Sequence, residues 1–156
     1  MYIKSIAERI AKRCGRNPFD VAEQLGIIIV YEPLGTIRGY YSKNFRQKFI
    51  HINSDLPEYL KNFVCAHEVG HAVLHEDLNT PFLRSNTLLS VNRYEIEANR
   101  FASCLLLSDR MLSEYVTEYG YTIPQIVSCT GLPETLVEYR FETLEDVVVR
   151  NEFVEC

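Results

Sequence analysis

The chain has 156 residues, of which 47% are hydrophobic and 24% are charged, and its formal net charge is −5 at pH 7. This size and composition suit one globular domain with a hydrophobic core. No long uncharged apolar stretch is present, which excludes a typical membrane-spanning protein, and residues 1–4 do not resemble the start of a secretion leader. We therefore expect a single soluble domain, residues 1–156, in the cytoplasm.

Cysteine usage agrees with a reducing compartment. The number of cysteines is odd, and their positions give no paired metal-ligand spacing: Cys14, Cys65, Cys104, Cys129 and Cys156. Cys65 and Cys104 fall on apolar helical stretches, so we expect them to be small buried hydrophobic residues and not redox centres.

The first third of the chain predicts two helices and a small sheet. Residues 3–14 carry apolar side chains at helical spacing with basic side chains opposite, which predicts an amphipathic packing helix. A short second helix is predicted over residues 18–25. Runs rich in β-branched and aromatic residues predict three strands, at 27–31, 39–42 and 48–52. We expect an antiparallel sheet and an α+β fold that is mainly helical.

A helix predicted from about residue 56 to about residue 76 contains the motif His67-Glu68-Val69-Gly70-His71. Histidines four residues apart lie one turn apart on one face of a helix, so both imidazoles can reach one cation. Glu68 lies close enough to hold a metal-bound water without being a ligand itself. This is the layout of a zinc-activated hydrolase. Gly70 weakens a helix, and we expect it to let a neighbouring strand or substrate approach closely.

A third ligand is expected, because catalytic zinc usually has three protein ligands and a water. A helix predicted over residues 93–107 places Glu95 and Asn99 on the same face as Ala102. A carboxylate on this apolar face is costly unless it is paired or bound to a metal, so Glu95 is the predicted ligand. Asn99 could orient a histidine ligand. Glu97 points almost the opposite way and is predicted to be a solvated helix residue.

Two further histidines have weaker claims to the site. His51 lies on the third predicted strand, and His75 lies one turn beyond His71. Each could be an extra ligand or could polarise the scissile carbonyl, although an ordinary surface or core histidine is the favoured interpretation. Residues 77–92 are polar and aperiodic, which predicts a mobile loop near the cleft where substrate selection could reside.

The C-terminal part, residues 108–156, differs in composition. Helical stretches around a Gly-containing turn look like a helix-turn-helix. However, this part has 3 basic and 10 acidic side chains, a net charge of −7. Because an acidic surface binds phosphates poorly, we expect a packing or protein-docking role and no direct nucleic-acid binding. Residues 145–150 are expected to form a short strand or to fray.

The two motifs together resemble the ImmA/IrrE metallo-endopeptidases. The resemblance rests on residues 66–71, on Glu95-Ile96-Glu97-Ala98-Asn99-Arg100-Phe101-Ala102 and on the leucine run 105–107, and it extends over most of residues 1–140. The leucine run usually ends in Met-Pro in that family, whereas Ser108 and Asp109 follow here. The resemblance implies a small cytoplasmic protease of a prophage or mobile element in a bacterial host, which cleaves a helix-turn-helix repressor and can require an activator protein.

The expected mechanism follows from the predicted ligands His67, His71 and Glu95. Zn²⁺ held by these residues would lower the pKa of a bound water, and Glu68 would act as general base and then protonate the departing amine. An edge strand beside the metal helix could bind an extended substrate by backbone pairing. One alternative is a metal-binding module that controls a transcription factor by contact without proteolysis. Another is a toxin-like hydrolase with the same chemistry.

Overall fold

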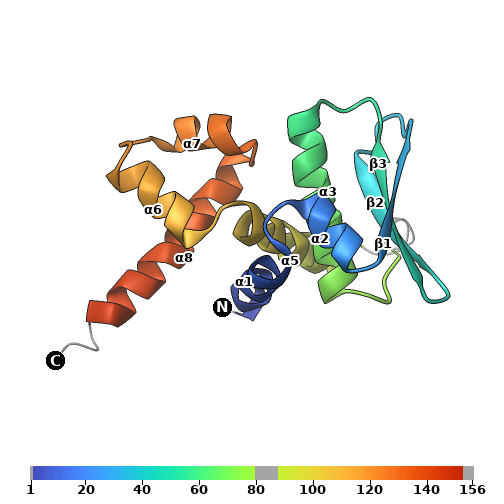
Figure 1. Ribbon diagram of the computed structural model, residues 1–156, viewed down its shortest axis with the longest axis horizontal. Helices are drawn as coiled ribbons and strands as arrows, with labels where there is room; N and C mark the ends of the chain where they lie inside the picture. Colours follow the sequence, from blue (N-terminus) through green and yellow to red (C-terminus); the bar gives the residue numbers. More distant parts are fainter. Residues whose placement is uncertain (1, 80–87, 153–156) are drawn as a thin grey trace.

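The computed structural model describes residues 2–79 and 88–152, and it confirms a mainly helical α+β fold (Figure 1). In Figure 1 the sheet and α3 form the right end of the molecule, and α6, α7 and α8 form the left end. Helices α1 and α5 lie between these two ends. The elements follow in this order: α1 (Tyr2–Cys14), α2 (Pro18–Gln24), β1 (Ile27–Glu32), β2 (Gly39–Asn44), β3 (Gln47–Asn53), α3 (Glu58–Leu74), α5 (Leu88–Leu106), α6 (Asp109–Thr117), α7 (Ile123–Thr130) and α8 (Glu134–Glu152).

The sheet is mixed, so the prediction of an antiparallel sheet is wrong for one of its two pairings. The strand order is β1-β3-β2, with β2 antiparallel and β1 parallel to β3. Phe45 and Arg46 join β2 to β3 as a tight hairpin, and Phe45 has a φ of 55°. Strand directions still alternate along the chain. The error lies in the assumption that neighbours in sequence are neighbours in the sheet.

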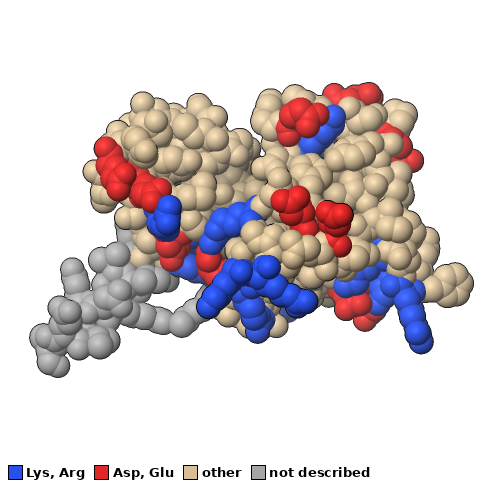
Figure 2. Space-filling model, viewed as in Figure 1, with Lys and Arg blue, Asp and Glu red and all other residues tan. Residues whose placement is uncertain are grey.

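Helix α1 covers α5 with its apolar face. Ile6, Ala7 and Cys14 are buried, whereas the basic side chains predicted on the opposite face are exposed. In Figure 2 basic side chains gather at the lower edge of the molecule, over α1. The periodicity of residues 3–14 therefore predicted both faces of this helix correctly.

Helix α3 is the central element of the fold. Every residue from Phe63 to Ala72 is buried, because the sheet lies on one side of the helix and α5 on the other. The helix is shorter at each end than predicted. Pro57 is its N-cap and makes no side-chain capping hydrogen bond, and His75 leaves helical geometry with φ −135°.

Two glycines allow close approaches to α3. A Cβ atom at Gly70 would lie 3.1 Å from both the Cα and the carbonyl oxygen of Ala98. The close neighbour of Gly70 is therefore α5, and the prediction of a strand or substrate at this place is wrong. A Cβ atom at Gly39 would lie 2.6 Å from Val64 Cγ1 and 2.8 Å from the carbonyl oxygen of His51. Glycine at these positions therefore sets how closely α5 and β2 pack on the motif helix.

The buried Arg140 attaches α8 to the rest of the protein. Its side chain is fully buried, and its Nε donates to the carbonyl oxygen of Leu107 at 2.9 Å. The guanidinium also pairs with Asp109, whose other carboxylate oxygen lies 2.7 Å from Lys4 Nζ on α1. Residues 145–150 continue α8 as helix, so the predicted short strand does not form.

The structure settles some further expectations. The described thiols of Cys14, Cys65 and Cys104 are free and buried, as predicted, and that of Cys129 is free and exposed. Within residues 2–79 and 88–152, no helix is long and apolar enough to cross a membrane. The predicted loop at 77–92 is partly wrong, because α5 begins at Leu88, and residues 80–87 lie outside the described residues.

The Asp109 cluster predicts a pH-dependent stability. Burial raises the pKa of Asp109, but the hydrogen bonds and charges of Lys4 and Arg140 outweigh it and hold this pKa below its usual range. Because the folded-state pKa is lowered, the ionised aspartate stabilises the protein at pH values above the unfolded value of about 3.9. This stabilisation is lost as the pH falls through the folded-state value.

We expect Asp109→Asn to lower the free energy of unfolding by about 1–3 kcal/mol at neutral pH, because a buried guanidinium loses its counter-charge. The difference from wild type should begin to shrink as the pH falls below the unfolded value of about 3.9, and it should vanish once the pH is below the lowered folded-state pKa. Urea unfolding at neutral pH and at a pH low enough to protonate Asp109 measures this difference in the free energy of unfolding. Asp55→Asn, at an exposed site, is the control. An equal loss at both pH values would contradict the ion-pair account.

Candidate metal centre

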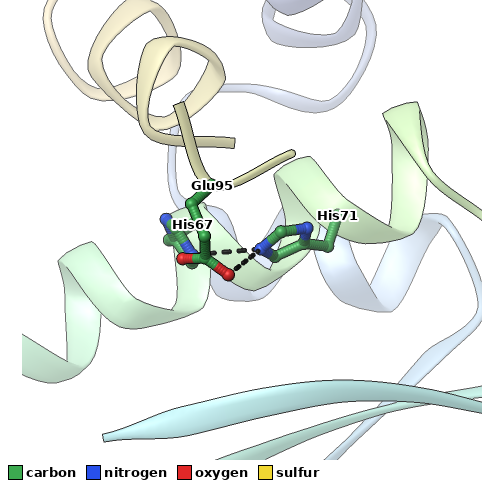
Figure 3. A group of neighbouring side chains, drawn as sticks. All are labelled: His67, His71 and Glu95. Atoms are coloured by element: carbon green, nitrogen blue, oxygen red, sulfur yellow. Dashed lines mark hydrogen bonds and ion pairs between the residues drawn. The ribbon is translucent and has the colours of Figure 1, made fainter. Parts of the chain in front are cut away.

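The structure brings the three predicted ligands together between α3 and α5. Helix α3 presents the imidazoles of His67 and His71 one turn apart, and Glu95 reaches down to both from α5 (Figure 3). Glu95 Oε2 lies 3.2 Å from His67 Nε2, and Glu95 Oε1 lies 3.4 Å from His71 Nε2. The two Nε2 atoms are 3.1 Å apart. This is the only group of three or more potential ligands found among the described residues.

These separations fit a tetrahedral metal ion. Ligand atoms about 2.0–2.1 Å from zinc, at a tetrahedral angle to one another, lie about 3.3 Å apart. The 3.1 Å between the two Nε2 atoms agrees with that value, and one ligand atom from each of the three residues lies within 4.8 Å of the others. Two imidazoles and a carboxylate also form a donor set that zinc accepts, although manganese and iron accept it too. The residues present therefore fit a bound metal with one coordination position left for water.

Asn99 lies beside the first histidine, as the sequence predicts. Its Oδ1 is 2.8 Å from His67 Nδ1. Because an amide oxygen can only accept, His67 donates from Nδ1, and this leaves Nε2 as the atom that a metal would take in exchange for a proton. His71 Nδ1 is buried and has no hydrogen-bond partner in the described part of the chain. Asn99 therefore gives the site an orienting contact for His67.

Burial and the neighbouring charges shift the pKa values of these three residues in opposite directions. Burial raises the pKa of Glu95, but the hydrogen bonds and charges of His67 and His71 hold this pKa far below its usual range. Burial lowers the pKa of His67, yet contacts with Glu95 and Glu68 raise it overall. For His71 burial dominates and lowers the pKa. Glu95 is thus ionised and His71 neutral near pH 7, which are the protonation states that ligate a metal.

Glu68 lies in the same cavity as two of the three candidate ligands, His67 and Glu95. Its side chain is buried, with 1% relative exposure, and it follows His67 on α3. A cavity of about 310 Å³ is lined by both residues, by Glu95 and by Asn99. The carboxylate of Glu68 therefore lines the same half-open cavity as His67 and Glu95, where a general base could reach a water at the metal position.

The cavity wall contains residues that the sequence analysis missed. Arg38 and Gly39 contribute one side, at the start of β2, and the first turn of α8 contributes Pro133, Thr135 and Leu136. These segments are about a hundred residues apart in sequence, and no local pattern marks them as neighbours. The C-terminal helices, predicted as a packing or docking unit, thus form part of the wall of the cleft.

The other histidines lie outside the three-ligand group. His51 pairs with Glu32 at 2.6 Å and stacks on Tyr40, with ring centroids 4.2 Å apart. His75 Nε2 lies 3.3 Å from a carboxylate oxygen of Glu97. The prediction that Glu97 is a solvated helix residue is wrong in part, because its side chain is 23% exposed and also pairs with Arg93. Helix α5 contacts α1, α3 and α8, so the side opposite Glu95 is partly covered as well.

Known proteins resemble this chain in sequence and in fold. The peptidase family described as the IrrE N-terminal-like domain matches residues 22–142. An uncharacterized immunity region protein of Bacillus phage phi105 is 40% identical over 140 residues, covering 88% of both chains. The metallopeptidase ImmA of Bacillus subtilis strain 168 is 31% identical over 146 residues, covering 91% of this chain and 85% of the relative.

A solved structure has a similar fold. It is a transcriptional regulator from Mycobacterium tuberculosis, with a TM-score of 0.61 and 18% sequence identity. The match covers 88% of this chain but only 45% of that protein. At this identity the likeness supports the fold alone.

The contact between Asn99 and His67 predicts a change in metal affinity. We expect Asn99→Ala to weaken zinc binding by about 10–100-fold, the range typical for loss of a group that orients a ligand. Asn99→Asp keeps an oxygen acceptor and should retain most of the affinity. Competition with a chromophoric chelator measures both, with Ile96→Ala at an exposed position of α5 as control. Unchanged affinity in Asn99→Ala would show that His67 does not depend on this contact.

Proposed function

Because the chain belongs to the IrrE N-terminal-like peptidase family, a family of metallopeptidases, we propose that it is a zinc-dependent endopeptidase that cuts a protein substrate at a defined site. The observation that carries the proposal is the convergence of His67, His71 and Glu95, with ligand atoms within 4.8 Å of one another, and the position of Glu68 in the cavity that His67 and Glu95 line. Two histidines and a carboxylate with an open fourth position are the ligand set of hydrolytic zinc sites.

In the proposed mechanism the metal ligands, Glu68 and Asn99 have separate roles. His67, His71 and Glu95 would hold the zinc ion, which would supply Lewis acidity near neutral pH. Glu68 accepts the proton as the peptide carbonyl is attacked and then delivers it to the leaving amine. Asn99 holds His67 in the ligating tautomer. The walls of the cavity limit bulk water around the reacting carbonyl and strengthen these electrostatic contacts.

Strand β2 is suited to bind the substrate backbone. It is an edge strand, and it packs against α3. The amide of Asn53 donates to the carbonyl oxygen of Arg38 at 2.9 Å, so in the antiparallel alternation the peptide groups of Gly39 point to the open edge. The peptide groups of Lys43, four residues further along β2, also point to the open edge. There the backbone amide of Lys43 donates to Asn79 Oδ1 at 2.7 Å. An extended peptide pairing at Gly39 would lie beside Glu68.

The proposed substrate is a DNA-binding repressor of a prophage or mobile element. Support comes from the relative named as an immunity region protein of a Bacillus phage and from the metallopeptidase ImmA. Phage immunity depends on a repressor, and cleavage of that protein would end it. We propose that the chain acts on a helix-turn-helix repressor encoded near its own gene, with an activator protein as a possible further partner.

The test is co-expression with the neighbouring repressor, followed by intact mass analysis of the products. Wild type should give two defined fragments. Glu68→Gln should bind zinc at one ion per chain yet lower the cleavage rate by about 10²–10⁴-fold, because the proton acceptor is lost. Glu58→Gln, with a side chain 90% exposed on the same helix, is the matched control and should cleave normally.

Two outcomes would oppose the proposal. Cleavage by Glu68→Gln at the wild-type rate would remove Glu68 from the mechanism. An intact repressor in the presence of zinc-loaded wild type, with a stable complex between the two proteins, would favour the regulatory module that acts by contact.

A further inference from the structure

Arg38 occupies a distinctive place in the cleft. It lines the same cavity as His67, Glu68 and Glu95, at the point where the edge strand β2 begins. Among the described residues that line this cavity, it is the only arginine or lysine. Its side chain is exposed, and within residues 2–79 and 88–152 its guanidinium makes no hydrogen bond or ion pair. A guanidinium with five donors and no protein partner is available to a ligand.

The backbone that carries Arg38 is held firmly. Its carbonyl oxygen accepts the amide of Asn53 at 2.9 Å. The side-chain amide of Asn53, a buried residue, donates to the carbonyl oxygens of Gly35 and Ile37, each at 3.0 Å. The amide of Ile37 also donates to Leu34 at 3.1 Å. The turn before β2 is therefore fixed by β3, and it presents Arg38 at a defined position beside the cleft.

The two anionic groups of the cavity do not neutralise Arg38. Glu95 is held by His67 and His71, and neither Glu68 nor Glu95 pairs with the guanidinium. The remaining wall is largely apolar, with Phe63, Val64 and Leu136. An incoming peptide thus meets the positive charge of Arg38 beside apolar surfaces, and the carboxylates of Glu68 and Glu95 in the same cavity. An acidic side chain is the group that an arginine fork binds best, through two parallel hydrogen bonds.

From this arrangement we infer that Arg38 is a specificity-determining residue that binds an aspartate or glutamate of the protein substrate. Because Arg38 directly precedes Gly39, a peptide paired with the β2 edge places its acidic residue within a few positions of the scissile bond. The inference rests on the proposed peptidase function. It deepens that function by assigning a charge preference to one position of the substrate.

The test selects peptides by binding, so that it does not depend on turnover. A random peptide library displayed on phage is selected against zinc-loaded Glu68→Gln protein and against the same protein carrying Arg38→Glu. Arg46→Glu is the matched control, because Arg46 is an exposed arginine in the β2–β3 turn and does not line the cavity.

We expect the parent protein to enrich Asp or Glu at one peptide position. Arg38→Glu should lose that enrichment and favour Lys or Arg there, whereas Arg46→Glu should match the parent. For a selected peptide and its Glu→Lys counterpart, the affinity ratio should change by about tenfold or more in Arg38→Glu, as expected when an attractive charge pair becomes repulsive. Absence of acidic enrichment in the parent, or an unchanged preference in Arg38→Glu, would overturn the inference.

Cleavage of the selected peptides by wild type separates this inference from the proposed function. Charge-dependent binding without cleavage would leave the role of Arg38 intact and would count against the peptidase activity. Cleavage with no charge preference would support the peptidase activity and would count against the role of Arg38. If Arg38→Glu slowed turnover of acidic and basic peptides equally, with unchanged affinities, Arg38 would act on the reacting carbonyl and the inference would be wrong.

Discussion

Helices α3 and α5 pack so closely at Gly70 that a methyl group there would lie 3.1 Å from the backbone of Ala98. Gly70 lies between His67 and His71, and Ala98 lies three residues, or about one turn, after Glu95. This close approach of the two helices is therefore within one turn of every proposed ligand. Glycine inside a helix costs about 1 kcal/mol relative to alanine. The structure tolerates this cost because a larger residue would move Glu95 away from the imidazoles.

The rest of the fold supports this contact from both sides. The sheet covers the face of α3 opposite α5, and Gly39 lets β2 lie directly against Val64. Arg140 and Asp109 attach α8 beyond α5, which places the first turn of α8 at the edge of the cavity. The cleft is thus enclosed by segments from the start, the middle and the end of the chain. Its shape depends on the whole domain, whereas its chemistry comes from α3 and α5.

The sequence predicted the local parts of this arrangement well, because they follow from helical geometry. The spacing of His67 and His71 and the common face of Glu95 and Asn99 are properties of single helices, and the structure brings all four side chains together. The family resemblance is confirmed by the comparisons. Long-range features were not predictable. The position of β3 between β1 and β2, the wall formed by α8 and the pairing of Glu97 with His75 depend on contacts that no periodicity encodes.

The central claim is that three side chains are arranged in advance to bind one metal ion, and anomalous X-ray diffraction from crystals of the zinc-loaded protein tests it most directly. The account predicts a single zinc peak about 2.0–2.2 Å from His67 Nε2, His71 Nε2 and a carboxylate oxygen of Glu95. A zinc ion held elsewhere, for example by His75 and Glu97, or a site lacking Glu95 among its ligands, would contradict it.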